Sequence, residues 1–341
     1  MRTYHILYAI LIICSGCVSK NRESAPADSL SVDTLSVSLV SDLAKFEITD
    51  PSCLTSFDKY ILFHTSSDID NQLHLFDVDL NPIGHGVLYG SGPSDILEIT
   101  SINVYDSNPY IYDARKGSVY TLCIKDSLTI NKWTDCIPLM DNVMVVDKDR
   151  LIVATIQGDY SYALINKSGS LSDSIAYYPP IPKGVSPLTH ALACTGTMSV
   201  IPSQKIYARS VAFDGGIDFF SYSNDKISHI NRYSLFDMNY DVIPQGPGLP
   251  VPNQDSRMGF IKIVGAYDCF YASFSGEKAL ENPEGYANMI YKFDSQGTLL
   301  KKYHAPYEFS DFTVSEKNNK IWTISTDQNN NKDMIITYEL P

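Results

Sequence analysis

The sequence predicts an all-β fold, a six-bladed β-propeller, and three observations lead to it. One two-strand pattern returns five times along the chain, and each copy ends in the Asn, Asp, Gly or Ser residues that reverse a hairpin. The chain has 23 Tyr and 14 Phe, and aromatic rings pack well on pleated strands. No stretch keeps the 3.6-residue apolar period of a helix. At 341 residues and 44% hydrophobic, the chain has the apolar material for a large core.

The five hairpins define the repeat. They occupy residues 73–82, 119–127, 162–169, 219–226 and 290–297. Two shorter strands precede each hairpin, and in the third copy they are residues 142–146 and 151–156. Four antiparallel strands per unit, returning at roughly 45 residues, are typical of a propeller blade. A two-sheet sandwich is the alternative, but it does not explain six strand quartets with matching turns.

The sixth unit is expected to form from both ends of the chain. Its third strand covers residues 334–338, and the sequence then ends at Pro341. Residues 34–39 alternate as a strand should and have no partner of their own. Pairing these two segments would complete the sixth blade, close the ring and remove two exposed sheet edges. The propeller is therefore expected over residues 34–341.

The first 33 residues have the pattern of an export and anchoring segment. A basic Arg2 precedes an apolar run, residues 6–14, that is too short to span a bilayer. The sequence Cys14-Ser15-Gly16-Cys17 resembles the bacterial lipobox. This resemblance implies a signal peptide over residues 1–16 and a lipid on Cys17, with residues 17–33 as a flexible tether. An uncleaved anchor and a redox pair of Cys14 and Cys17 are the alternatives.

Charge and motifs exclude several functions. The formal net charge of -13 argues against nucleic acid, whose phosphates need a basic face, and against electrostatic docking on an anionic membrane. No Gly-x-Ser-x-Gly, His-Glu-x-x-His or Walker loop occurs. We therefore expect no catalytic residues, no metal and no cofactor. No disulfide pairing can be deduced for the remaining cysteines, Cys53, Cys123, Cys136, Cys194 and Cys269.

A family resemblance appears after the first hairpin. Residues 90–96 read Gly-Ser-Gly-Pro-Ser-Asp-Ile, and Tyr112-Asp113 precedes the second hairpin. These segments resemble the Gly-x-Gly-Pro-x-Glu-Phe region of the TolB-like six-bladed propeller lipoproteins of Bacteroidota. The resemblance implies a cell-envelope binding or scaffold protein. Physically, Gly-x-Gly-Pro predicts a tight turn between blades, and no helix follows it that would make a phosphate cradle.

The lengths of the connections predict where a ligand meets the protein. Links between the second and third strands of a blade, and links between blades, open on one rim of the disc. Nearly every long segment falls in this set: residues 66–72, 89–95, 179–190, 237–258 and 275–287. Long loops on a rigid scaffold commonly carry function, so we expect ligands at this rim, above the central channel. The alternative is that the Pro-rich segments only cover hydrophobic blade edges.

Eight residues are candidates for ligand binding at this rim: His64, Arg115, Lys116, Tyr160, Arg209, Asp214, Arg257 and Tyr286. An Arg fork binds a carboxylate or phosphate at two points, and a Tyr ring can stack on a sugar or peptide. The alternative for each Arg is an ion pair with an Asp of the neighbouring blade.

These observations predict a monomeric lipoprotein in the cell envelope. It would be held by Cys17 to the outer membrane, facing the periplasm, and would bind a glycan, peptide or protein partner as a recognition or scaffold module. A propeller-type hydrolase or lyase acting on a polymer is the alternative, and a structural subunit of an envelope complex is a third hypothesis.

Overall fold

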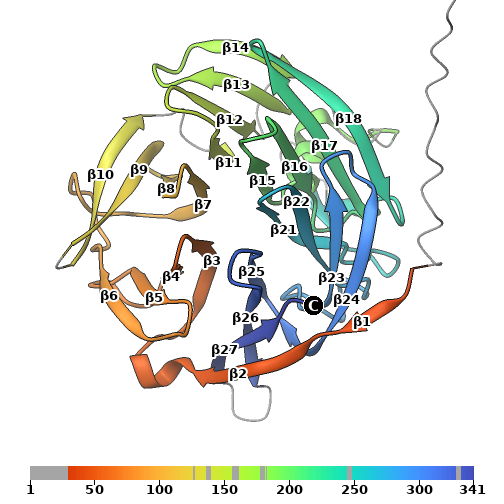
Figure 1. The fold of residues 1–341 in the computed structure, drawn as a ribbon. Helices are drawn as coiled ribbons and strands as arrows, with labels where there is room; N and C mark the ends of the chain where they lie inside the picture. The colour runs from red at the N-terminus through yellow and green to blue at the C-terminus, as the bar shows by residue number, and fades with distance from the viewer. Residues whose placement is uncertain are drawn as a thin grey trace, which may run out of the picture.

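Six blades of four β-strands stand around a central axis (Figure 1). This computed structural model describes residues 30–125, 127–135, 140–155, 161–176, 181, 183–243, 248–327 and 332–341. Within these ranges, no helix has the length and apolar character needed to cross a membrane. The predicted six-bladed propeller is confirmed, and the sandwich is excluded.

The first three blades follow one another along the chain, each from its innermost to its outermost strand. Blade 1 contains β3 (Pro51–Phe57), β4 (Tyr60–Thr65), β5 (Leu73–Asp77) and β6 (Pro82–Gly86). Blade 2 contains β7 (Ile99–Tyr105), β8 (Asn108–Asp113), β9 (Ser118–Ile124) and β10 (Leu128–Asp135). Blade 3 contains β11 (Met140–Val145), β12 (Arg150–Thr155), β13 (Tyr162–Asn166) and β14 (Leu171–Ile175).

The other three blades complete the ring. Blade 4 contains β15 (Met198–Ile201), β16 (Ile206–Ser210), β17 (Gly216–Ser223) and β18 (Lys226–Ser234). Blade 5 contains β21 (Phe260–Ala266), β22 (Cys269–Phe274), β23 (Ala287–Asp294) and β24 (Leu299–Phe309). Blade 6 contains β25 (Asp311–Ser315), β26 (Lys320–Asp327) and β27 (Lys332–Glu339), with β2 (Ser36–Asp42) as its outer strand. The connections hold the remaining elements: β1 (Val32–Thr34), the 3-10 helix η2 (Leu43–Phe46), α1 (Pro187–Ala193), and the hairpin of β19 (Asp241–Ile243) and β20 (Leu249–Val251). A single bridge between β6 and β10 joins the first two blades into one eight-stranded sheet, and β1 adds a fifth strand to blade 5.

The core lies between the blades. Six clusters of buried apolar residues occur, one at each interface between neighbouring blades. Strand β12 shows how one strand serves two of them. Leu151 and Val153 belong to the cluster shared with blade 2, whereas Ile152 and Ala154 belong to the cluster shared with blade 4. Because side chains alternate along a strand and both faces are buried, the strand reads as a continuous apolar run.

The N-terminal segment closes the ring, as expected, but it pairs with two blades. Strand β2 runs antiparallel to β27 in blade 6, and β1 runs parallel to β24 in blade 5 (Figure 1). Leu35 lies between the two strands. It is only 2% exposed, packs in the cluster that contains Tyr303 and Tyr338, and its N–H donates to His304 O at 2.9 Å. The single strand expected over residues 34–39 is therefore wrong in detail, because burial of Leu35 divides it.

Truncating Leu35 tests this closure. We expect Leu35→Ala to lower the free energy of unfolding by about 3 kcal/mol, because it leaves a cavity between blades 5 and 6. Val37, two residues later, is 40% exposed, and Val37→Ala should cost less than about 1 kcal/mol. Urea denaturation of both variants is the measurement. If both variants lost the same free energy of unfolding, burial of Leu35 would not be what holds the N-terminal segment to the ring.

Candidate functional site

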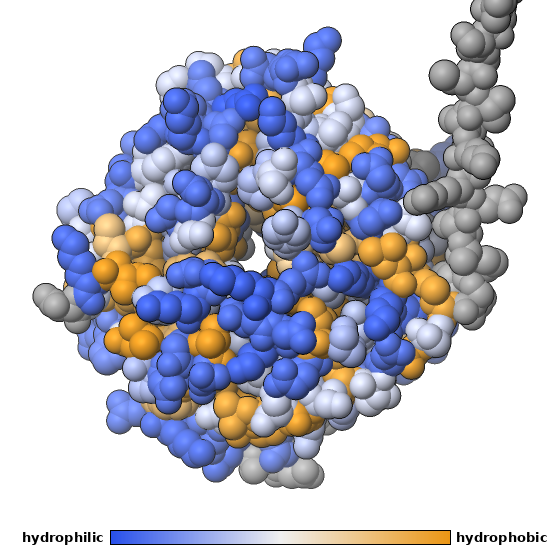
Figure 2. Space-filling view, viewed as in Figure 1, coloured by the Kyte–Doolittle hydropathy of each residue, from blue (hydrophilic) through white to orange (hydrophobic). Residues whose placement is uncertain are grey.

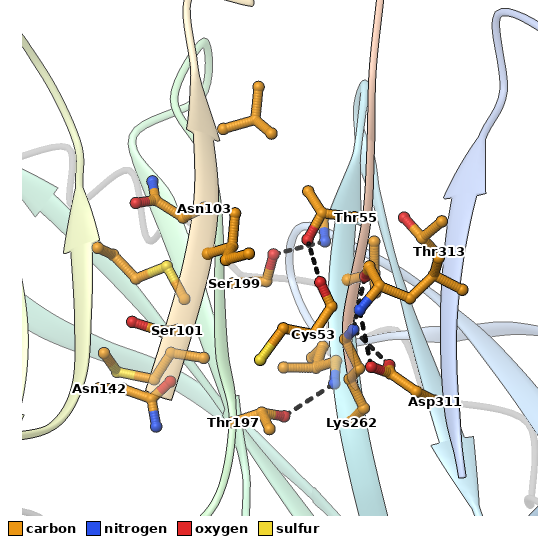
Figure 3. Close-up of a pocket in the computed structure, with 18 of the residues that line it drawn as sticks. Cys53, Thr55, Ser101, Asn103, Asn142, Thr197, Ser199, Lys262, Asp311 and Thr313 are labelled. Carbon is orange, nitrogen blue, oxygen red and sulfur yellow. Dashed lines mark hydrogen bonds and ion pairs between the residues drawn. The ribbon is translucent and has the colours of Figure 1, made fainter. Parts of the chain in front are cut away.

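The innermost strands of the six blades surround a central cavity of about 270 Å³. Its lining mixes hydroxyl and amide side chains with apolar side chains (Figure 3). Figure 2 shows one face of the disc, hollowed at its centre, with hydrophilic residues prominent around the opening. The cavity is therefore the natural candidate for a ligand site, and the partners of its polar groups decide whether it is one.

In blade 2, polar side chains of the inner strand bind the backbone of blade 3. Ser101 Oγ donates to Val143 O at 3.2 Å, and Asn103 Nδ2 donates to Val145 O at 3.0 Å. The Val145 N–H donates back to Asn103 Oδ1 at 3.2 Å. The inner edge of β11 has no strand beside it, so these side chains satisfy backbone groups that would otherwise be buried without partners.

The same two-residue spacing returns in blade 4. Thr197 Oγ1 accepts from the N–H of Ile263 at 3.0 Å, and Ser199 Oγ accepts from the N–H of Gly265 at 2.7 Å. Gly265 is required here, because a Cβ at this position would lie 2.7 Å from Val200 O. Strand β15 therefore holds β21 at close range by side-chain to backbone hydrogen bonds.

Blade 6 repeats the arrangement towards blade 1. Asp311 Oδ2 accepts from the N–H of Leu54 at 2.8 Å, and Thr313 Oγ1 accepts from the N–H of Ser56 at 3.0 Å. Lys262 of blade 5 also reaches this point. It forms an ion pair with Asp311 and donates to Leu54 O at 2.8 Å. Three blades meet at this ion pair (Figure 3).

Most of the polar cavity lining is thus occupied in holding the blades together. The exception of chemical interest is Cys53, whose thiol projects into the cavity (Figure 3). Burial, and then the charge of Asp311, raise the pKa of this thiol to about 11. It is protonated at neutral pH and is not set up as a nucleophile. The cavity wall therefore provides shape and hydrogen-bond capacity.

The Gly-x-Gly-Pro segment is a turn between blades 1 and 2, as predicted. Asp95 Oδ2 accepts from the N–H of Gly92 at 3.0 Å. A Cβ at Gly90 or Gly92 would lie 2.6 or 2.5 Å from that same carboxylate oxygen, so a larger residue at either position would displace the Asp95 side chain. Lys116 Nζ donates to the carbonyls of Gly92 and Asp95, each at 2.7 Å. Lys116, a predicted ligand-binding residue, instead fixes this turn.

Three other predicted ligand-binding residues are buried, so they do not present charge at the rim. His64 is 7% exposed, and Ser52 Oγ lies 3.0 Å from its Nδ1. Burial lowers the pKa of His64 to about 4, so the ring is neutral at neutral pH. Asp214 is fully buried and forms an ion pair with Arg232. Burial raises the pKa of its carboxyl.

Arg209 is the third buried candidate, and it forms an ion pair with an Asp of the neighbouring blade, which was the alternative to ligand binding. It is 3% exposed, and its Nη2 lies 2.9 Å from Asp141 Oδ2 in the neighbouring blade. The guanidinium carbon lies 5.2 Å from the ring centroid of Tyr162, and Nη2 also donates to Cys194 O. Arg209 therefore joins blades 3 and 4. The prediction failed because the face of a strand that meets a neighbouring blade depends on tertiary packing.

The remaining candidates lie at the rim. Arg115 is exposed and pairs with Glu98 at 3.0 Å, and exposed Arg257 donates to Gly276 O at 2.9 Å. Tyr286 is half-buried, with its hydroxyl 3.3 Å from Thr326 Oγ1. Tyr160 lies outside the described residues. Arg115 and Arg257 come from different blades and are held by separate partners, so no charged cluster forms from them.

The exposed apolar residues concentrate on the rim with the long connections, which we call the loop rim. Among the described residues, nineteen large hydrophobic side chains are exposed. One, Tyr267, lies in a turn of the opposite rim, and eight lie on outer strands or their continuation. The other ten lie in loop-rim connections: Ile69, Leu88, Tyr89, Ile181, Leu188, Leu235, Val242, Ile243, Leu249 and Leu280. A contiguous patch of exposed apolar groups marks an interaction site, so the loop rim is the candidate surface for a partner.

Four of the cysteines have free thiols in the structure. Cys194 and Cys269 are buried, and Cys53 and Cys123 are partly buried. Burial raises the pKa of the Cys194 thiol to about 12. The thiol groups of Cys123 and Cys269 also take part in hydrogen bonds: Asn131 Nδ2 donates to Cys123 Sγ at 2.8 Å, and Cys269 Sγ donates to Asp268 Oδ1 at 3.2 Å. Cys17 and Cys136, and with Cys17 the whole lipobox, lie outside the described residues.

Fold and sequence together define the class of protein as a six-bladed propeller with one elaborated rim. The chain belongs to the TolB-like 6-blade propeller-like family, whose model matches residues 45–317. No curated protein matches the sequence.

Two solved structures share the fold over most of their length. An exported protein from Bacteroides fragilis is 11% identical with a TM-score of 0.53, covering 91% of this chain and 94% of that one. A member of the DUF4221 family from Bacteroides vulgatus is 9% identical with a TM-score of 0.54, covering 89% and 97%. At these identities the likeness concerns the fold alone.

The sequence contains a signal for the inter-blade hydrogen bonds. Blades 2, 4 and 6 each carry two polar residues, separated by one apolar residue, at the innermost strand. They read Ser101-Ile102-Asn103, Thr197-Met198-Ser199 and Asp311-Phe312-Thr313. Polar residues at this spacing in a buried strand indicate hydrogen bonding to a backbone edge.

Removing one of these side chains should weaken the ring. Asn103→Ala leaves the N–H and C=O of Val145 without partners, and we expect it to lower the free energy of unfolding by about 2 kcal/mol. Asn131→Ala is the matched control, because Asn131 is exposed on β10, and should cost less than about 0.5 kcal/mol. Chemical denaturation measures both. An unchanged free energy of unfolding in Asn103→Ala would contradict the role of these hydrogen bonds.

The buried His64 predicts a dependence of stability on pH. Its folded pKa of about 4 lies below the ordinary 6.5, so between these values only the unfolded chain binds the proton. The free energy of unfolding should therefore fall as pH falls from 6.5 to 4, by up to about 3 kcal/mol. Asp50, whose charge opposes this shift, and His74, whose charge adds to it, face the same ring. Urea denaturation of wild type and His64→Gln at pH 7 and 4.5 tests this prediction. If both proteins lost the same free energy of unfolding between these pH values, the prediction would be refuted.

Proposed function

We propose that this propeller is a recognition or scaffold module of the cell envelope whose partner docks on the loop rim. One observation carries the proposal: ten of the nineteen exposed large hydrophobic side chains lie in loop-rim connections, against one in a turn of the opposite rim. A glycan site would be built from aromatic rings and polar groups, and only Tyr89 among the ten is aromatic. The apolar content favours a peptide or protein partner over a glycan.

The rim connections are held rigidly enough to present such a surface. Tyr89 N–H donates to Ile69 O at 2.8 Å, which joins the 66–72 and 89–95 segments. Asp113 is fully buried; its Oδ2 accepts from the N–H of Leu97 at 2.8 Å, and its Oδ1 accepts from those of Arg115 and Lys116 at 3.1 Å. A prepared surface loses little entropy when a partner binds.

We place the protein at the outer membrane, facing the periplasm, as a monomer held by a lipid on Cys17. The lipobox pattern of residues 14–17 and the tether composition of residues 17–33 support this location. Such a tether would leave the propeller free to meet its partner at a distance from the membrane.

Affinity capture from native membranes tests the proposal. The bait is the full lipidated protein, compared with a variant carrying Ile69→Ser, Leu88→Ser and Tyr89→Ser and with the opposite-rim control Tyr267→Ser. We expect the triple variant to lose most of a saturably captured partner and Tyr267→Ser to keep it. Arg115→Ala and Arg257→Ala should weaken capture by smaller factors. Loss with Tyr267→Ser alone would contradict the proposal.

A further inference from the structure

A hollow on blade 1 holds two histidines that neither the fold nor the loop rim uses. Its lining includes Phe46 of η2, Phe76, Ile83, His74 and His85. Phe46 comes from the link between β2 and β3, so the hollow lies where the N-terminal segment meets the first blade. The two imidazoles are the ionisable groups of this lining.

His74 and His85 are directly opposite each other on β5 and β6. Their ring centroids lie 6.0 Å apart, with the ring planes inclined by 46°. With metal–nitrogen bonds of about 2.0–2.1 Å, two imidazoles on one ion keep their centroids about 5–6 Å apart. The separation of the two rings therefore suits joint ligation after a small rotation of the exposed His85 side chain.

His74 has an unused ring nitrogen. The residue is 6% exposed, and its Nε2 is buried without a hydrogen-bond partner. The ring also hydrogen-bonds to the backbone of Asn71, which leaves Nδ1 as the nitrogen that donates. A histidine whose Nδ1–H is held by a backbone carbonyl presents the Nε2 lone pair, the usual arrangement of a metal-ligating imidazole.

The surroundings hold His74 in place and leave the hollow open. Phe63 stacks on its ring at 6.0 Å, and Phe76 stacks on Phe63 at 5.2 Å. His85 is exposed, and a Cβ added at Gly84 would meet nothing within 4 Å. The negative charge of Asp68 acts on His74 and favours a cation there. The buried Nε2 of His74 has no hydrogen-bond partner and lies beside a second, exposed imidazole, so this hollow offers two ring nitrogens to one ligand.

We propose that His74 and His85 bind a divalent transition-metal ion such as Zn²⁺, Ni²⁺ or Cu²⁺ through one nitrogen each. Imidazole ligands suit these ions, whereas Ca²⁺ and Mg²⁺ prefer oxygen. Water or a group from a bound partner completes the coordination. Because the ion joins β5 to β6 next to η2, binding stabilises the folded state of blade 1.

Titration calorimetry with Zn²⁺ and Ni²⁺ on tag-free protein tests the site, with thermal unfolding as a second readout. Wild type should bind one ion and gain thermal stability. His85→Ala, a change at an exposed position, should weaken binding at least about ten-fold and abolish the gain. His304→Ala is the matched control on blade 5 and should bind as wild type does. Ca²⁺ should give no signal.

Two further variants keep the result unambiguous. His74→Gln, checked for folding by circular dichroism, should lose binding as His85→Ala does. Cys269→Ser removes a ligand from the other candidate group, Asp268, Cys269 and Glu316, and should keep the wild-type affinity. Absence of binding by wild type at millimolar Zn²⁺, unchanged affinity in His85→Ala, or loss confined to Cys269→Ser would each overturn the proposal.

Discussion

At three of the six interfaces between blades, the ring depends on hydrogen bonds between side chains of one inner strand and the backbone of the next. An inner strand has a neighbour on one side only, so its free edge faces the adjacent blade and the cavity with unpaired N–H and C=O groups. Ser101 and Asn103, Thr197 and Ser199, and Asp311 and Thr313 supply the missing partners. Because side chains two residues apart point the same way along a strand, each pair matches two backbone groups of the next blade.

The cavity wall and the loop rim, the two regions that a ligand could meet, differ in what their side chains contact. The cavity wall uses its hydroxyls, amides and the pair of Lys262 and Asp311 to hold blades together. The buried Arg209 and Asp214 likewise form ion pairs, with the partly buried Asp141 and Arg232. The loop rim carries most of the exposed apolar residues outside the strands. Among the described residues, the polar groups of the cavity wall are therefore largely used between blades, whereas most exposed apolar residues outside the strands lie on the loop rim.

The sequence predicted what is local and missed what depends on neighbouring blades. Turn residues such as those at 295–297 define a hairpin without tertiary information. The strands and the long connections were therefore predictable, and so was the closure by β2. The burial of His64 and Arg209 was not, because a charged residue in a strand reads the same whether its face meets solvent or another blade. The pair of His74 and His85 also escaped notice, since cross-strand register brings together residues eleven positions apart.

The way the N-terminal segment is attached has a mechanical consequence. Strand β1 lies parallel to β24, whereas β2 belongs to blade 6. A pull on residues before β1 would reach blade 5 first, through the three register pairs of β1 and β24. The buried side chain of Leu35 would then have to leave the core before the force reached β2. Traction from a membrane anchor would thus be absorbed before it could open the disc.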